Sequence, residues 1–226
     1  MNNCSVFINS CDRYSFIWEG WNYFYQKFWN KEIPWKVYFG TEKKGVDFLD
    51  VTNLKLGKIQ WGEYIHKVMD MIPTDNVFFT MEDHFPVKKL DIGLVKNMYK
   101  FFIDNKMDRL GLMGYHHPLK EPTNRIETNF NKTFYQQTRQ SQYLSCCQPS
   151  LWRKEFLCSV IQKDWGPWHG ELTGTQVIQG FENIKIGYLI EDDWYIEALT
   201  EGHPRDERHG LNNWKILTEN YGWRGI

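Results

Sequence analysis

Two adjacent carboxylates, Glu82 and Asp83, stand where an apolar stretch of the sequence ends. The five residues before them, Val77 to Met81, carry no charge, and so short an apolar run is typical of a strand buried on both faces. Carboxyl ends of parallel strands form the crevice in which open α/β sheets bind ligands. Neighbouring carboxylates repel one another there unless a cation is present, and their oxygens suit Mg²⁺ or Mn²⁺ bound together with phosphate. The pair therefore indicates a phosphate–metal site, with a solvated acidic turn as the alternative.

Two further polar turns are expected at the same edge of the sheet. In such turns a carboxylate can bond a ribose hydroxyl and a tyrosine can stack on a base. The alternatives are that Asp12 caps the following helix and that the second turn is an ordinary strand–loop junction. No glycine-rich phosphate loop occurs in the chain, so a metal on carboxylates would have to neutralise phosphates. The residues concerned are Ser10, Asp12, Arg13 and Tyr14 after the strand Cys4–Asn9, and Thr41 and Glu42 after the strand at 35–39.

A candidate base lies in the second half of the chain, where Glu171 follows a loop rich in tryptophan, glycine and proline. We expect a helix over 172–179, so that Glu171 would lie at its start and be stabilised as an anion by the helix N-terminus. A carboxylate held in that way can act as a general base on a sugar hydroxyl. Trp168 is then a floor for a sugar ring, with His169 beside it as a further acceptor contact. The alternative is a capping glutamate with packing tryptophans.

The remaining histidines of the chain are more typical of surface loops, but His203 is a candidate to complete a metal shell or to close over a diphosphate.

The order of expected elements predicts an α/β fold. Strands and amphipathic helices alternate as β-α-β-α-β up to residue 81, which predicts a mostly parallel central sheet flanked by helices. Further helices are expected over 91–102, 151–161 and 211–220, and short strands at 134–136 and 144–147. We interpret the chain as a single domain, with a Rossmann-like nucleotide-binding half at 1–115 and a substrate-binding half at 116–226. Trp61, at the start of the second helix, is assigned to the nucleotide-binding residues.

Composition excludes some classes of function. The net charge of −1 and the absence of a Lys/Arg run argue against a nucleic-acid partner. The five cysteines form no Cys-x-x-Cys pair, which indicates reduced thiols and a cytoplasmic location. The sequence shows no secretory leader and no apolar run approaching the roughly 20 residues of a membrane span, so any membrane contact would be peripheral.

Five stretches, in this order, resemble the GT-A-fold, nucleotide-sugar-dependent glycosyltransferases, and specifically the small bacterial and large-virus enzymes that build surface or capsid glycans. They lie at 10–14, 39–42, 80–85, 148–156 and 167–171. The resemblance implies a hexosyl or deoxyhexosyl transfer from a nucleoside-diphosphate sugar, with a UDP-sugar favoured, to a glycan or glycoprotein acceptor.

The same resemblance implies roles for particular residues. It implies that Asp83 touches a Mn²⁺ or Mg²⁺ ion and that Glu171 is the base of an inverting transfer. The motif here is Glu-Asp-His and not Asp-x-Asp, so either His84 replaces one ligand or Asp83 and the diphosphate hold the metal alone. A sugar-phosphate nucleotidyltransferase and a non-catalytic carbohydrate-binding protein are the alternatives.

Overall fold

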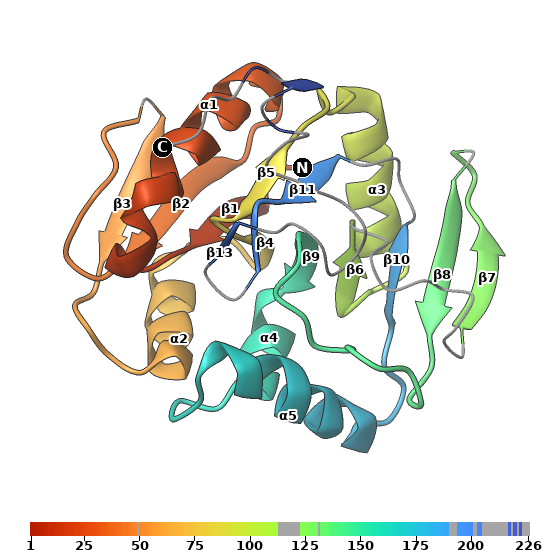
Figure 1. Ribbon diagram of the computed structural model, residues 1–226. Helices are drawn as coiled ribbons and strands as arrows, with labels where there is room; N and C mark the ends of the chain where they lie inside the picture. Colours follow the sequence, from red (N-terminus) through yellow and green to blue (C-terminus); the bar gives the residue numbers. More distant parts are fainter. Residues whose placement is uncertain are drawn as a thin grey trace.

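The computed structural model describes residues 1–48, 50–112, 123–130, 132–189, 194–200, 203–204, 217, 219–220 and 222. Within them, one nine-stranded mixed sheet runs through the molecule in the order β3-β2-β1-β4-β9-β6-β10-β8-β7 (Figure 1). Its strands in chain order are β1 Cys4–Asn9, β2 Lys36–Thr41, β3 Val51–Lys55, β4 Asn76–Met81, β6 Arg109–Gly111, β7 Thr123–Glu127, β8 Thr133–Gln137, β9 Ser150–Arg153 and β10 Ile186–Leu189.

The first four strands of the sheet confirm the predicted parallel β-α-β-α-β arrangement. The strands β3, β2, β1 and β4 are mutually parallel, so their carboxyl ends share one edge. β6 and β10 are also parallel to each other, whereas β9 runs antiparallel to both β4 and β6. The sheet is therefore mostly parallel and the fold class is α/β, as predicted.

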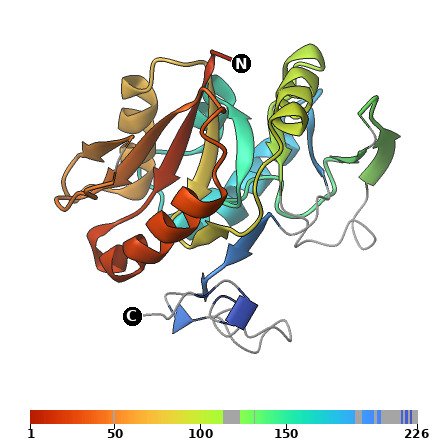
Figure 2. The same ribbon diagram turned by 90° about the horizontal axis from the view of Figure 1, so that it is seen from above.

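Helices cover both faces of the sheet (Figures 1 and 2). On one face lie α1 Trp18–Phe28, which follows the 3₁₀ turn η1 Asp12–Ile17, and α3 Ile92–Asp104. On the other lie α2 Trp61–Met71, α4 Lys154–Val160 and α5 Pro167–Gly180. Each set buries an apolar stripe in its own core cluster, because residues three and four apart share one side of a helix. The stripe of α1 contains Trp18, Trp21, Phe24 and Tyr25, and that of α2 contains Ile65, Val68 and Met69.

The expected helix over 151–161 is wrong in its first residues, which form the strand β9. Leu151 packs in the core on one face of the sheet and Trp152 in the core on the other, which is the alternation of a strand. Pairing with β4 and β6 satisfies the backbone of this segment, and α4 begins only at Lys154. The strand expected at 144–147 is also wrong, because that segment is a loop packed on α5.

A small second sheet follows the acidic pair. The strand β5 His84–Pro86 pairs antiparallel with β11 Tyr195–Glu197, which brings the C-terminal part of the described chain over the sheet edge. The backbone N–H of Ala198 donates to the Asp83 carbonyl at 2.6 Å. Two further short strands, β12 Leu199–Thr200 and β13 His203–Pro204, pair with each other. The helix expected over 211–220 lies almost entirely outside the described residues.

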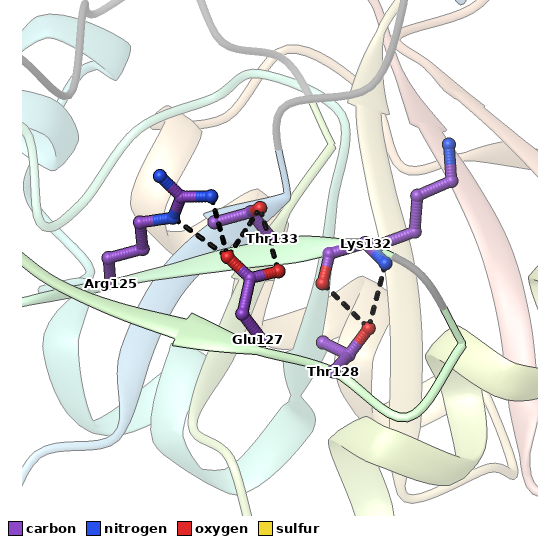
Figure 3. A network of polar contacts seen from close by, with 5 residues as sticks. All are labelled: Arg125, Glu127, Thr128, Lys132 and Thr133. Carbon is purple, nitrogen blue, oxygen red and sulfur yellow. Dashed lines mark hydrogen bonds and ion pairs between the residues drawn. The ribbon is translucent and has the colours of Figure 1, made fainter.

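At the far edge of the main sheet, β7 and β8 form a hairpin fastened by polar side chains (Figure 3). Glu127 accepts from Arg125 Nε at 2.8 Å and from the Thr133 hydroxyl at 3.2 Å. Across the turn, the Thr128 hydroxyl donates to the Lys132 carbonyl at 2.7 Å. These charged and hydroxyl groups suit an edge strand, which natural sheets protect from pairing with other chains.

No helix within the described part of the chain is both long and apolar enough to cross a bilayer.

Candidate active site

A cavity of about 210 Å³ opens at the carboxyl ends of β1, β2 and β4. The parallel arrangement of these strands places the turns after each of them around one space. Five residues predicted to bind the nucleotide line it together, namely Ser10, Tyr14, Glu42, Trp61 and Glu82. Its other lining residues are Asn9, Cys11, Gly57, Ile59, Tyr64, Met81 and Pro167. Pro167 belongs to α5, so the second half of the chain contributes to the wall of this cavity.

Three buried polar atoms in this region have no hydrogen-bond partner among the described residues. They are Asn9 Oδ1, Trp61 Nε1 and Glu82 Oε2, each a buried atom of a residue that lines the cavity. The Asn9 amide already donates to the Met81 sulfur at 3.3 Å, which leaves its carbonyl oxygen to accept from another group. Buried polar atoms in proteins are nearly always bonded, and an unmade bond costs on the order of 1–3 kcal/mol. Three such atoms on residues of one cavity can have their bonds completed by a polar ligand or by ordered water.

Glu82 is 2% exposed, and its surroundings oppose its ionisation. Burial, followed by the charge of neighbouring Asp83, raises the pKa of the Glu82 carboxyl well above its ordinary value. A hydrogen bond with the Ser10 side chain acts in the opposite direction and lowers it. The two neighbouring carboxyls thus differ in environment, since the Asp83 side chain is one-quarter exposed.

Asp83 is a partly exposed carboxylate beside the buried Glu82, and no ready-made cluster of metal ligands surrounds it among the described residues. Its Oδ1 lies 3.1 Å from His84 Nδ1. Among the described residues, no three His, Cys, Asp or Glu side chains are grouped so that they alone could hold an ion. One or two carboxylates together with substrate phosphates are enough for Mg²⁺, so Asp83 fits a metal held jointly with a diphosphate. The His203 side chain lies outside the described residues, and its metal role stays a prediction.

Glu171 points away from solvent toward the loop at 144–150. Its Oε1 accepts the Cys147 backbone N–H at 2.7 Å. Burial raises the pKa of the Glu171 carboxyl, while the Cys147 N–H and the positive charges of His84 and Arg109 act to lower it. His84, which follows the acidic pair in the chain, is thus among the groups whose charge acts on the Glu171 carboxyl. That Glu171 and the acidic pair serve one reaction stays a prediction.

The expected reason for an anionic Glu171 is wrong. The helix begins at Pro167, with Gly166 as its N-cap, so Glu171 is its fifth residue and no acidic residue lies in its first turn. The field of a helix terminus fades within one turn. The groups that favour the anion are instead the Cys147 amide and nearby positive charge, and they only partly offset burial, which raises the pKa of Glu171.

Asp12 and Thr41 do not line the cavity but shape the loop beside it. Both Asp12 oxygens accept from the backbone N–H groups of Lys43 and Lys44, at 3.1–3.2 Å. The interpretation of Asp12 as a helix cap is wrong, because Cys11 occupies that position and no side chain caps the helix. The Thr41 hydroxyl is buried and donates to the Lys44 carbonyl at 2.5 Å. Any direct contact of these two residues with a nucleotide stays a prediction.

The remaining predicted residues are exposed. Arg13 lies with its guanidinium 5.7 Å from the Tyr14 ring centre, beside the cavity. Trp168 is 62% exposed and His169 is also exposed, both on the first turn of α5. They are available to an acceptor that approaches along this helix.

Several residues of this region were not predicted from the sequence. Asn9 could have been found, because it is a polar residue at the end of an apolar strand. The Cys147 amide could not, since its position depends on how α5 packs against the sheet. Pro167 marks the start of α5 in the sequence, but its place in the cavity wall depends on the same packing. The role of Arg109 could not be predicted either, because a polar residue at the start of a short strand is common.

Comparisons with known proteins identify solved structures of similar fold. No protein-family model matches this chain, and no curated protein sequence does. Crystal structures of S. aureus TarS 1-349 are similar in fold. In complex with UDP-GlcNAc, TarS has a TM-score of 0.59 at 14% identity, over 89% of this chain and 60% of that one. In complex with UDP, the TM-score is 0.57 at 13% identity, over 85% and 59%.

The chain thus spans about three-fifths of the length of those TarS chains. Identities this low show the fold and nothing finer. The order of the parallel strands, the helices on both faces and these structural neighbours agree on one architecture. The chain has a GT-A-like α/β fold, similar to that of the TarS structures.

Proposed function

We propose that this protein is a glycosyltransferase that uses a nucleoside-diphosphate sugar, with a UDP-sugar favoured. The observation that carries the proposal is the cavity at the carboxyl ends of the parallel strands, with three buried polar atoms that lack partners. Ligands of open α/β sheets bind at this edge. The structural neighbour TarS was crystallised with UDP-GlcNAc and with UDP, which supports a uridine nucleotide as the first ligand to test.

The cavity suits the nucleoside part of such a donor. Tyr14 and Trp61 offer aromatic surface for a base, and the polar atoms of Asn9 and Glu82 are positioned to bond its edge or the ribose. Ser10, Glu42 and exposed Arg13 surround the same opening as further nucleotide contacts, with Asp12 and Thr41 holding the loop beside them. The diphosphate would then extend toward Asp83, which follows Glu82 in the chain.

In the proposed reaction, Glu171 removes the proton from an acceptor hydroxyl as that oxygen attacks the anomeric carbon of the donor sugar. The new glycosidic bond forms as the bond to the diphosphate oxygen breaks, and the nucleoside diphosphate leaves with the electron pair. A single displacement inverts the configuration at the anomeric carbon. Trp168 and His169, exposed one turn before Glu171, are the proposed acceptor contacts for a glycan or glycoprotein.

Asp83, with His203 as a second ligand, is proposed to hold Mn²⁺ or Mg²⁺. When bound, the metal would neutralise negative charge on the diphosphate. The narrower class of small bacterial and large-virus enzymes, the division into halves at residue 115 and the cytoplasmic location all stay predictions.

Calorimetric titration with UDP in the presence of Mn²⁺ tests this proposal. We expect saturable binding that weakens when a chelator removes the metal. An absence of UDP binding would count against a uridine nucleotide, and binding indifferent to chelator would count against the metal. Incubation with a nucleoside triphosphate and a sugar phosphate, followed by measurement of pyrophosphate release, distinguishes the nucleotidyltransferase alternative.

A further inference from the structure

Arg109, the first residue of β6, is a buried cation that the proposed reaction does not use. It is 3% exposed, and its guanidinium lies 5.4 Å from the ring centre of Trp152. No carboxylate lies within ion-pair distance of it among the described residues, and its Nε–H has no partner there. Burying an unpaired charge is costly, and proteins normally compensate for it locally. We therefore expect a group nearby whose negative charge the Arg109 guanidinium stabilises.

The guanidinium binds one segment of the chain at several points. Its NH2 donates to Cys146 Sγ at 2.7 Å and to the Ser150 hydroxyl at 3.1 Å. Its NH1 donates to the Leu144 carbonyl at 3.4 Å. All three acceptors are neutral and all belong to the loop at 144–150. Arg109 therefore fixes this loop against the sheet.

The same loop holds Glu171 from the other side. The Cys147 N–H donates to Glu171 Oε1 at 2.7 Å. The Ser145 N–H donates to the Thr175 hydroxyl at 3.2 Å, and that hydroxyl donates to the Glu171 carbonyl at 2.7 Å. A Cβ on Gly174 would lie 2.9 Å from Ser145 Oγ, so the loop and α5 are in close contact here. The position of the Glu171 carboxylate thus depends on the loop that Arg109 fastens.

Electrostatics agree with this geometry. The groups that act on the Glu171 carboxyl from neighbouring elements are Cys147, His84 and Arg109. Burial raises the pKa of Glu171, and the charge of Arg109 is among the influences that lower it. The charge of Arg109 also lowers the pKa of the Cys146 and Cys147 thiols, although burial dominates at both.

We propose that Arg109 is a positioning residue for Glu171. It holds the 144–150 loop so that the Cys147 amide meets the Glu171 carboxylate, and it supplies the buried positive charge on that side. The inference rests on the proposed function, because it takes Glu171 as the base. It adds a residue that touches neither donor nor acceptor and acts through the loop.

The test follows the Glu171 carboxyl directly and needs no substrate. In protein labelled with ¹³C-glutamate, the Glu171 signal is assigned by its loss in Glu171→Gln, and its titration midpoint is measured in each variant. In Arg109→Met, we expect the midpoint to move to higher pH. The matched control is Arg139→Met, because Arg139 also binds α5 but at its far end, through the Gln179 carbonyl at 2.8 Å from Nε. There we expect the wild-type midpoint.

A conservative variant separates charge from position. Arg109→Lys keeps the charge but cannot make the three contacts, so we expect a midpoint between those of wild type and Arg109→Met, together with faster hydrogen exchange at the Cys147 amide. A folded Arg109→Met protein with an unshifted midpoint would overturn the proposal. If the Met variant does not fold, unchanged exchange at Cys147 in Arg109→Lys overturns it instead. A shifted midpoint in a protein without transferase activity would count against the proposed function alone.

Discussion

Gly62, the second residue of α2, is the position at which the smallest substitution should do the most damage. A Cβ at Gly62 would lie 1.9 Å from the Gln162 carbonyl oxygen and 2.9 Å from the carbonyl carbon. Both atoms are backbone and cannot rotate away. The Gly62 N–H donates to the Trp165 carbonyl at 2.8 Å, and the Glu63 N–H donates to the Lys163 carbonyl at 2.9 Å. Gly62→Ala should force apart this contact between α2 and the turn before α5.

Opposing effects decide whether Gly62→Ala raises or lowers the free energy of unfolding. Alanine is favoured over glycine within a helix by about 1 kcal/mol, which would stabilise the variant. Overpacking typically costs about 1–3 kcal/mol, and each of the two backbone bonds contributes about 0.5–1.5 kcal/mol. We therefore expect a net loss of about 3 kcal/mol in the free energy of unfolding. In a chain of this length, that corresponds to a melting temperature lower by roughly 6–12 °C.

Urea denaturation and thermal melting measure this loss. Gly180→Ala is the matched control, because it places the same methyl in a helix where nothing lies within 4 Å of the added Cβ. We expect Gly180→Ala to be neutral or slightly stabilising. UDP affinity should also fall in Gly62→Ala, since Trp61 and Pro167 border the cavity on either side of the strained contact. A Gly62→Ala protein as stable as wild type would refute the reasoning.

Three further predictions concern the proposed reaction. Glu171→Gln should leave UDP affinity nearly unchanged while lowering turnover by on the order of 10²–10⁴, as measured by calorimetry and a donor-turnover assay. Asp83→Asn should weaken metal-dependent UDP binding and turnover together, and equal affinity with and without Mn²⁺ in wild type would contradict it. Because burial raises the pKa of Glu171, the base should become protonated, and turnover should fall, at pH values above those at which ordinary carboxyl groups titrate. The free energy of unfolding should change in the opposite direction and increase as the pH falls through that range. The stabilising contribution of protonated Glu171 is present below its unfolded pKa of about 4.3 and is lost as pH rises through its higher folded pKa, so wild-type stability relative to Glu171→Gln should decline across that window.

The parts of the fold that the sequence predicted are those whose signals are local. The stripe of Trp18, Trp21, Phe24 and Tyr25 has the spacing of a helix face, and α1 buries that face. The apolar run before Glu82 became β4, with its carboxyl end at the cavity. Both predictions needed only neighbouring residues, and both are confirmed.

Features that depend on distant partners could not be predicted in this way. Leu151 and Trp152 form a strand because β4 and β6 lie on either side, and neither neighbour is near them in the sequence. The start of α5 was different, because Pro167 at the first helical position is a recognisable signal that the prediction overlooked. Arg109 joins Glu171 only through a loop some 40 residues away along the chain. Its role depends on packing that no local pattern contains.

The central claim is that the cavity between Tyr14, Trp61 and Glu82 is the nucleotide site, and a crystal structure of this protein with UDP and Mn²⁺ tests it most directly. We predict the base in that cavity, with Asn9 Oδ1, Trp61 Nε1 and Glu82 Oε2 each within hydrogen-bond distance of the nucleotide and the diphosphate directed toward Asp83. UDP bound at another surface, or in this cavity with all three atoms still lacking partners, would contradict the account.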